Sequence, residues 1–172
     1  MEERTLKIVI LGDGGVGKTC LMSRFINGRM GSGDSTIGSA YFKKEIYVNE
    51  LKYTCEFWDV SGNKKFQTLA KLFLNDSKIV ILVYDITKKS SFKGLELWLD
   101  MVVEKLGTRA NLILVGNKID LYEDEEMSEQ TARKFAELIK AKFVLASAME
   151  GRYHNWNSFL ENEIKNYINK TK

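Results

Sequence analysis

The chain has no proline and only two cysteines among its 172 residues. Because Cys20 and Cys55 cannot build the disulfide framework of a small secreted domain, we expect free thiols in a reducing compartment. The apolar run 6–11 is short and interrupted by Lys7, which fits neither a signal peptide nor a membrane span. Without proline, the breaks between elements must come from glycine, asparagine and polar clusters. These absences exclude a disulfide-rich secreted scaffold and predict a cytoplasmic protein.

Neither sign of charge dominates, since the chain has 26 Lys and Arg residues and 23 Asp and Glu residues, which gives a net charge of +3. This charge is small and interleaved, so we expect no nucleic-acid partner. Apolar residues make up 44% of the chain and charged residues 28%, which are values of folded domains. No linker or repeat divides the sequence, so we expect a single domain over residues 1–172.

Short apolar or β-branched runs alternate along the chain with longer stretches of helical period. The predicted strands are 6–11, 41–48, 53–59, 79–84, 111–116 and 143–146. The predicted helices are 18–27, 66–74, 91–105, 128–140 and 155–169. This alternation predicts an α/β fold, with helices on both faces of a six-stranded and mostly parallel sheet. The second and third strands are too close for a crossover, so one antiparallel strand is expected.

A glycine-rich segment at residues 12–19 fits the pattern G-x-x-x-x-G-K-[ST] and lies between a predicted strand and a predicted helix. Glycines let backbone N–H groups turn toward phosphate oxygens, and the helix N-terminus adds its positive dipole end. Lys18 supplies a point charge, and the Thr19 hydroxyl can ligate Mg²⁺. The residues expected to hold a nucleoside triphosphate here are Asp13, Gly14, Gly15, Val16, Gly17, Lys18, Thr19 and Cys20.

This phosphate loop does not identify the base, so ATPases, small kinases and GTPases stay open at this point. Downstream, residues 117–120 read Asn-Lys-Ile-Asp and follow a predicted strand, at the edge where open α/β sheets bind ligands. Asp120 can accept two N–H bonds from guanine. Adenine lacks these donors, so a buried carboxylate here would reject adenine. The sequence therefore favours guanine.

Taken together, these motifs resemble the Ras superfamily of small GTPases, and more narrowly its Rab branch, from Leu6 to about Ile168. The further motifs that carry the resemblance are residues 35–38, 58–62, 84–87, Ser91 with Phe92, and 147–149. The resemblance implies a P-loop NTPase G domain with GTP or GDP and Mg²⁺ as cofactors. It also implies GTP hydrolysis and a switch function in vesicular membrane trafficking.

By the same resemblance, Thr36 lies in the first switch loop, with its hydroxyl on Mg²⁺ and its N–H on the γ-phosphate. Asp59 is expected to hold Mg²⁺ through water, and the Gly62 N–H to meet the γ-phosphate. The expected metal ligands are thus Thr19, Thr36 and Asp59. Hydrolysis removes the oxygens that Thr36 and Gly62 hold, so both loops would relax and change the surface offered to partners.

On the base side, the resemblance implies that Lys118 packs its stem along the base and that Ala148 offers an N–H to the guanine oxygen. Met30 stands where the family has an aromatic residue over the guanine, and glycines follow it at Gly31 and Gly33. Since glycines raise the entropy cost of ordering a loop, we expect faster spontaneous nucleotide exchange. The expected base-contacting set is Met30, Asn117, Lys118, Asp120, Ser147, Ala148 and Met149.

The second switch departs from the family pattern Asp-Thr-Ala-Gly-Gln-Glu-Arg-Phe, because residues 59–66 read Asp-Val-Ser-Gly-Asn-Lys-Lys-Phe. Asn63 replaces the water-orienting glutamine and is shorter by one carbon, about 1.5 Å of reach. Because in-line attack depends on the placement of that amide, we expect weak intrinsic hydrolysis. The expected catalytic residues are Lys18, Gly62 and Asn63. Lys64 replaces an acidic residue, so contacts with regulators are expected to be unusual.

The resemblance implies effectors, an exchange factor and a GTPase-activating protein as partners, through the switch loops around Thr36 and Asn63. Gly14 leaves room for an arginine supplied by such an activating protein. The tail 166–172 has no cysteine, so we expect no lipid anchor in this chain. Peripheral binding to vesicles or endomembranes would then need a lipidated tail or second domain outside it.

Two other functions stay open on the sequence alone. Asn63, Lys64 and Met30 suggest a pseudo-GTPase, a binding module held in one nucleotide state with little or no hydrolysis. An ATP-using P-loop enzyme such as a small kinase is opposed by Asp120 and by the absence of a lid-like arginine-rich insertion.

Overall fold

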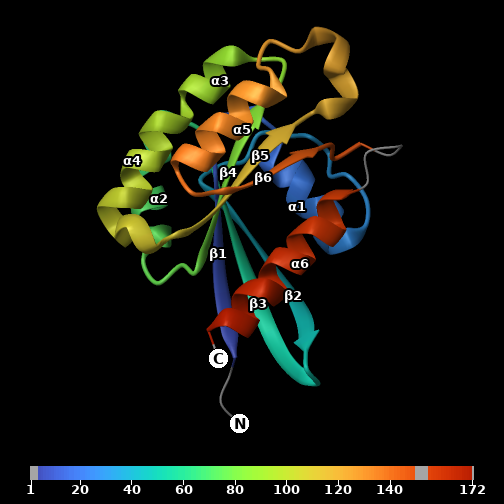
Figure 1. Cartoon of the computed structure of the whole chain (residues 1–172), viewed down its shortest axis with the longest axis vertical. Helices are drawn as coiled ribbons and strands as arrows, with labels where there is room; N and C mark the ends of the chain where they lie inside the picture. The colour runs from blue at the N-terminus through green and yellow to red at the C-terminus, as the bar shows by residue number, and fades with distance from the viewer. Residues whose placement is uncertain (1–3, 150–154, 172) are drawn as a thin grey trace.

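A twisted six-stranded sheet forms the centre of the computed structural model, which describes residues 4–149 and 155–171 (Figure 1). The strand order is β2-β3-β1-β4-β5-β6, and every neighbouring pair is parallel except β2 with β3. The strands are β1 Thr5–Leu11, β2 Ser39–Val48, β3 Leu51–Val60, β4 Ile79–Asp85, β5 Asn111–Asn117 and β6 Lys142–Ala146. The prediction of a mostly parallel sheet with one antiparallel strand is confirmed.

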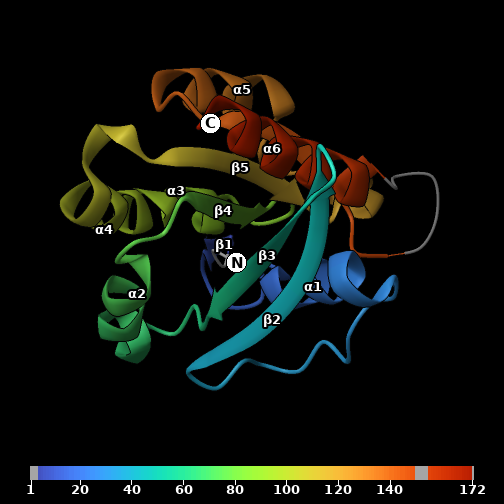
Figure 2. The same cartoon turned by 90° about the horizontal axis from the view of Figure 1, so that it is seen from below.

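Helices cover both faces of the sheet, as predicted (Figure 2). The helices are α1 Lys18–Asn27, α2 Gln67–Leu74, α3 Lys89–Lys93, α4 Leu95–Leu106, α5 Glu129–Leu138 and α6 Asn155–Lys170. Side chains alternate along β1, so that Ile8 and Ile10 pack toward α1 and α6 while Val9 and Leu11 pack toward α2, α4 and α5. Within the described residues, no helix is long and apolar enough to cross a bilayer.

The predicted helix 91–105 is wrong in one respect, because the structure divides this stretch into α3 and α4, with Gly94 between them. A Cβ atom on residue 94 would overlap the carboxylate of Asp13. The missing side chain of Gly94 therefore allows a close approach between this junction and the phosphate loop, which helical periodicity does not reveal.

Sequence motifs far apart in the chain meet at the carboxyl edge of the sheet because the strands are in register. Asp85 at the end of β4 pairs with Asn117 at the end of β5, and Asn117 pairs with Ala146 at the end of β6. On the other side of β4 in the sheet, Ile10 of β1 pairs with Asp59 of β3. Ile10 lies two residues before the start of the phosphate loop at Gly12. All the predicted site segments thus come to one edge, as expected for open α/β sheets.

Candidate functional site

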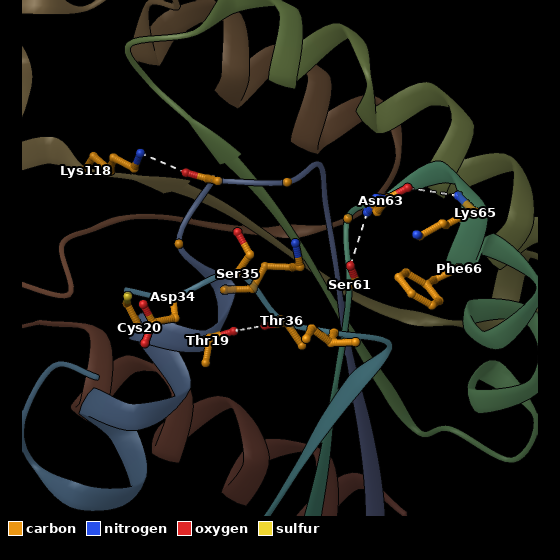
Figure 3. Close-up of a pocket in the computed structure, with 16 residues that line it drawn as sticks. Thr19, Cys20, Asp34, Ser35, Thr36, Ser61, Asn63, Lys65, Phe66 and Lys118 are labelled. Carbon is orange, nitrogen blue, oxygen red and sulfur yellow. Dashed lines mark hydrogen bonds between the residues drawn. The ribbon is translucent and has the colours of Figure 1, made fainter. Parts of the chain in front are cut away.

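A pocket of about 690 Å³ lies at this carboxyl edge, within the size range of ligand-binding sites (Figure 3). Three segments and one lysine line it: the phosphate loop, the loop before β2 and the loop after β3. The lining residues are Gly14, Gly15, Gly17, Lys18, Thr19, Cys20, Asp34, Ser35, Thr36, Ile37, Ser61, Gly62, Asn63, Lys65, Phe66 and Lys118.

Three glycines of the phosphate loop, Gly12, Gly15 and Gly17, have positive φ angles that strain other residues. Gly17 has a φ of +95°, and a Cβ atom there would overlap the side-chain amide of Asn117. The Lys18 ammonium is buried and donates to the carbonyl oxygens of Gly12 and Asp13 at 2.8 and 3.0 Å. Burial lowers the pKa of Lys18, against the opposing effect of the Asp59 and Asp13 charges. A cation is thus held at the start of α1, where the helix dipole also favours an anion.

The three expected metal ligands converge on one side of the pocket. The hydroxyl oxygens of Thr19 and Thr36 lie 2.6 Å apart (Figure 3), and the Thr19 hydroxyl donates to Asp59 Oδ2. Asp59 is fully buried, and its Oδ1 has no hydrogen-bond partner among the described residues. Burial raises the pKa of this carboxyl, opposed by the Thr19 hydrogen bond and the Lys18 charge.

Hydroxyl and carboxylate oxygens are the donors that Mg²⁺ prefers, so this set of residues fits that ion. The part of the chain that the structure describes holds no cluster of three or more His, Cys, Asp or Glu residues suited to a metal. Mg²⁺ commonly takes only one or two protein carboxylates and completes its shell with water and substrate phosphates. The donors therefore match a magnesium ion shared with a bound nucleotide.

The segment 117–120 is tied directly to the phosphate loop. Asn117 donates from Nδ2 to the carbonyl oxygen of Val16 at 2.8 Å, and Lys118 donates to that of Gly15 at 2.8 Å. The Lys118 ammonium also pairs with Asp85 Oδ2 at 2.7 Å. Burial acts to raise the pKa of Asp85, but the hydrogen bonds from Lys118 and Thr87 outweigh it and hold the pKa below its usual value. Asp85 thus fixes Lys118 between the two motifs.

The remaining base-side residues lie outside this pocket and are linked to one another. Ser147 donates from Oγ to Asp120 Oδ1 and accepts the Met149 N–H at 3.0 Å. Ala148 is buried, whereas Met149 and Met30 are exposed. Asp120 itself is half-buried. The Asp120 carboxylate thus keeps part of its surface accessible, and its expected role in reading guanine stays a prediction.

Two residues of the predicted phosphate-binding set direct their side chains elsewhere. Val16 is buried in the hydrophobic core under α1. Asp13 accepts a hydrogen bond at 2.9 Å from the indole N–H of Trp98 on α4. These two residues are available to a ligand through their backbone, while their side chains anchor the loop to the fold. The sequence analysis missed Trp98, since it stands 85 residues from Asp13 and no local pattern connects them.

Changing Trp98 to phenylalanine is expected to lower the free energy of unfolding by about 2 kcal/mol, because a partly buried charge-assisted hydrogen bond to Asp13 is lost. Urea denaturation followed by circular dichroism measures this change. The matched control is Trp58→Phe, since the Trp58 indole N–H is buried without an acceptor among the described residues. A loss in the control equal to that in Trp98→Phe would contradict the anchoring role.

The sequence analysis also missed six residues that line the pocket, one of which is Ser61, next to Gly62. Asp34, Ser35 and Ile37 flank Thr36, and Lys65 and Phe66 follow Asn63. Their proximity in the chain to Thr36 and Asn63 was the available signal, because a loop that brings one residue to a pocket brings its neighbours too.

Asn63 lines the pocket, but its amide is used locally. Its Oδ1 accepts the Lys65 N–H at 3.1 Å and caps the short helix η1, Lys64–Phe66 (Figure 3). Its backbone N–H donates to the hydroxyl of Ser61 at 3.3 Å. Ser61 is in turn joined by its N–H to the carbonyl oxygen of Gly38, at 2.8 Å. The segment after β3 is thus braced by its own side chains and by the start of β2.

Known proteins are similar to this chain over most of its length. The model of the Ras family matches residues 7–167. The Ras-related protein Rab-5B of Dictyostelium discoideum is 32% identical over 167 residues, which cover 96% of this chain and 78% of that protein. Human Ras-related protein Rab-30 is 37% identical over 145 residues, covering 84% and 71%, and mouse Rab-12 is 37% identical over 147 residues, covering 84% and 60%. The chain belongs to the Ras family and is a Rab-like small GTPase.

Proposed function

We propose that this chain is a guanine-nucleotide switch of Rab type, which binds GTP and GDP with Mg²⁺ and hydrolyses GTP slowly. The observation that carries the proposal is the convergence of the Thr19, Thr36 and Asp59 oxygens beside the buried Lys18 ammonium. Those four groups come from three segments of the chain. Residues 1–172 would form a single G domain.

In this proposal the phosphate loop holds the triphosphate. Backbone N–H groups of the loop and the N-terminus of α1 face the phosphate oxygens, and Lys18 neutralises charge on them. Mg²⁺, held by Thr19, Thr36 and Asp59, would stabilise the charge that develops on the phosphate oxygens during transfer. Asn117 and Lys118 keep the base-reading segment in register with the loop through Val16 and Gly15.

The switch itself would work through Thr36 and Gly62. Gly62 packs against the phosphate loop, and a Cβ atom there would overlap the backbone of Asp13 and Gly14. A γ-phosphate bound at this place has to displace or engage the Gly62 backbone, which moves the segment after β3. Effectors, an exchange factor and a GTPase-activating protein would read the loops around Thr36 and Asn63. Binding to vesicle or endomembrane surfaces would be peripheral.

The competition between GTP and ATP for the purified protein with Mg²⁺ tests the base preference. GTP and GDP are expected to displace a fluorescent guanine nucleotide, while ATP does not. Preferential binding of ATP would reject the switch and restore the P-loop kinase alternative. Met30 and its neighbouring glycines are expected to give rapid spontaneous release of GDP, which the same fluorescent nucleotide reports.

Asn63→Gln is expected to speed single-turnover GTP hydrolysis severalfold. The longer side chain carries its amide farther into the pocket, and it also releases the Lys65 N–H that Asn63 Oδ1 now caps. Asn63→Ala, which removes the amide altogether, is the control and is expected to be no faster than the wild type. If both wild type and Asn63→Gln are inert while GTP binds tightly, the pseudo-GTPase alternative replaces slow hydrolysis.

A further inference from the structure

A buried arginine on α1 joins two loops that lie on the base side of the site. Arg24 is 8% exposed. Its Nε–H donates to the carbonyl oxygen of Ala148 at 2.9 Å, and its Nη1 donates to that of Gly28 at 2.8 Å. These acceptors are 120 residues apart in the chain. One guanidinium therefore sets the separation of two distant loops.

The loop after β6 is held on both sides of one peptide bond. The carbonyl oxygen of that peptide, from Ala148, accepts from Arg24, and its N–H, from Met149, donates to Ser147 Oγ. Ser147 also donates to Asp120. Arg24 is thus linked through a continuous set of hydrogen bonds to the carboxylate expected to read guanine.

The second loop begins at the end of α1. Gly28 caps this helix with a φ of +71°, and its N–H donates to the Arg24 carbonyl oxygen at 3.0 Å. Arg24 therefore binds Gly28 through both its backbone and its side chain. Two residues farther on is Met30, the residue that takes the place of the aromatic cover over the base.

We propose that Arg24 is a positioning residue for the nucleotide base: its guanidinium fixes the gap between the 147–149 loop and the start of the 28–38 loop. The inference rests on the proposed guanine-binding function. The planar guanidinium presents several donors in a fixed geometry, which suits two carbonyl oxygens on different loops. Lysine has a compact ammonium on a flexible stem and cannot hold the two acceptors at the same spacing.

The chain offers a matched control for the packing of α1. Asn157 of α6 donates from Nδ2 to the Arg24 carbonyl oxygen at 3.2 Å, and Trp156 donates from Nε1 to that of Leu21 at 3.0 Å. Asn157→Ala therefore weakens the attachment of α1 to α6 without removing a bond to Ala148 or Gly28. A change in nucleotide dissociation that appears in both the Arg24 variants and Asn157→Ala reflects lower stability of α1. A change confined to the Arg24 variants reflects the altered separation of the two loops.

The test measures dissociation of GDP, ADP and 6-thioguanosine diphosphate from wild type, Arg24→Gln, Arg24→Lys and Asn157→Ala. In the thio analogue a weakly accepting sulfur replaces the guanine oxygen, while both N–H donors to Asp120 are kept. Arg24→Gln and Arg24→Lys are expected to release GDP about tenfold faster, with little change for the analogue, because the 147–149 loop no longer meets that oxygen. Asn157→Ala is expected to lower Tm and to keep the wild-type ratio of the rates for GDP and the thio analogue.

An unchanged ratio of the dissociation rates of GDP and the thio analogue in both Arg24 variants would overturn the positioning role, even if their Tm falls. A wild-type protein that binds ADP as tightly as GDP would instead overturn the proposed guanine-binding function, and the inference with it. The two failures are therefore distinguishable in one set of measurements.

Discussion

Gly12→Ala is expected to lower the free energy of unfolding by more than about 4 kcal/mol, among the largest effects of a single substitution. Gly12 has a φ of +151°, and a Cβ atom there would overlap the carbonyl oxygen of Val83. That oxygen cannot move aside, because β4 is paired with both β1 and β5. Urea denaturation of the purified protein measures the loss.

Gly14→Ala is the matched control, since it makes the same chemical change two residues farther along the same loop. A Cβ atom on residue 14 has open space within 4 Å. The free energy of unfolding is expected to stay within about 0.5 kcal/mol of the wild type. Comparable losses at Gly12 and Gly14 would show that the loop tolerates no side chain for reasons other than contact with β4.

Asp120→Asn is expected to weaken GDP binding by roughly 10² to 10⁴, because two hydrogen bonds from guanine to a carboxylate are lost. Asparagine presents one acceptor and one donor in place of two acceptors. It should therefore favour xanthosine diphosphate, whose base carries an oxygen where guanine has its amino group. Competition of GDP and xanthosine diphosphate for one fluorescent nucleotide gives both affinities.

Ser147→Ala provides the intermediate case for this prediction. It removes the hydroxyl that donates to Asp120 Oδ1 but leaves the carboxylate in place. The expected loss of GDP affinity is about tenfold, with no gain for xanthosine diphosphate. If Asp120→Asn keeps wild-type affinity for GDP, the base is read by other residues, and the assignment of segment 117–120 fails.

The local pattern of apolar and polar residues was sufficient to predict most strands and helices, because these elements form between neighbours in the sequence. The β-branched run at 79–84 is buried on both faces as β4, and the stripe Trp156, Leu160, Ile164 and Ile168 packs against the sheet. Boundaries shifted by a few residues where capping decides them. Ser128, predicted as the first helical residue, is the N-cap of α5, and its Oγ accepts the Thr131 N–H.

The candidate site could be predicted only where residues act through short, ordered motifs. The phosphate loop and the segment 117–120 are such motifs, since their spacing is itself the physical requirement. Asn63 shows the limit: its position was predicted, but its amide caps η1, a contact that depends on the actual path of the loop. Asp120 is a second example, because the exposed fraction of its side chain depends on which elements pack nearby.

The sequence by itself determined the alternation of strands and helices, the glycine-rich segment 12–19 and the segment 117–120 at the carboxyl edge, because each is encoded in adjacent or regularly spaced residues. Only the tertiary structure decided how these parts are held. The Asp13–Trp98 bond, the Gly94 break and the bridge from Arg24 to Ala148 join residues tens of positions apart. Such contacts follow from packing of whole elements around the sheet, and no periodicity or motif in one segment contains that information.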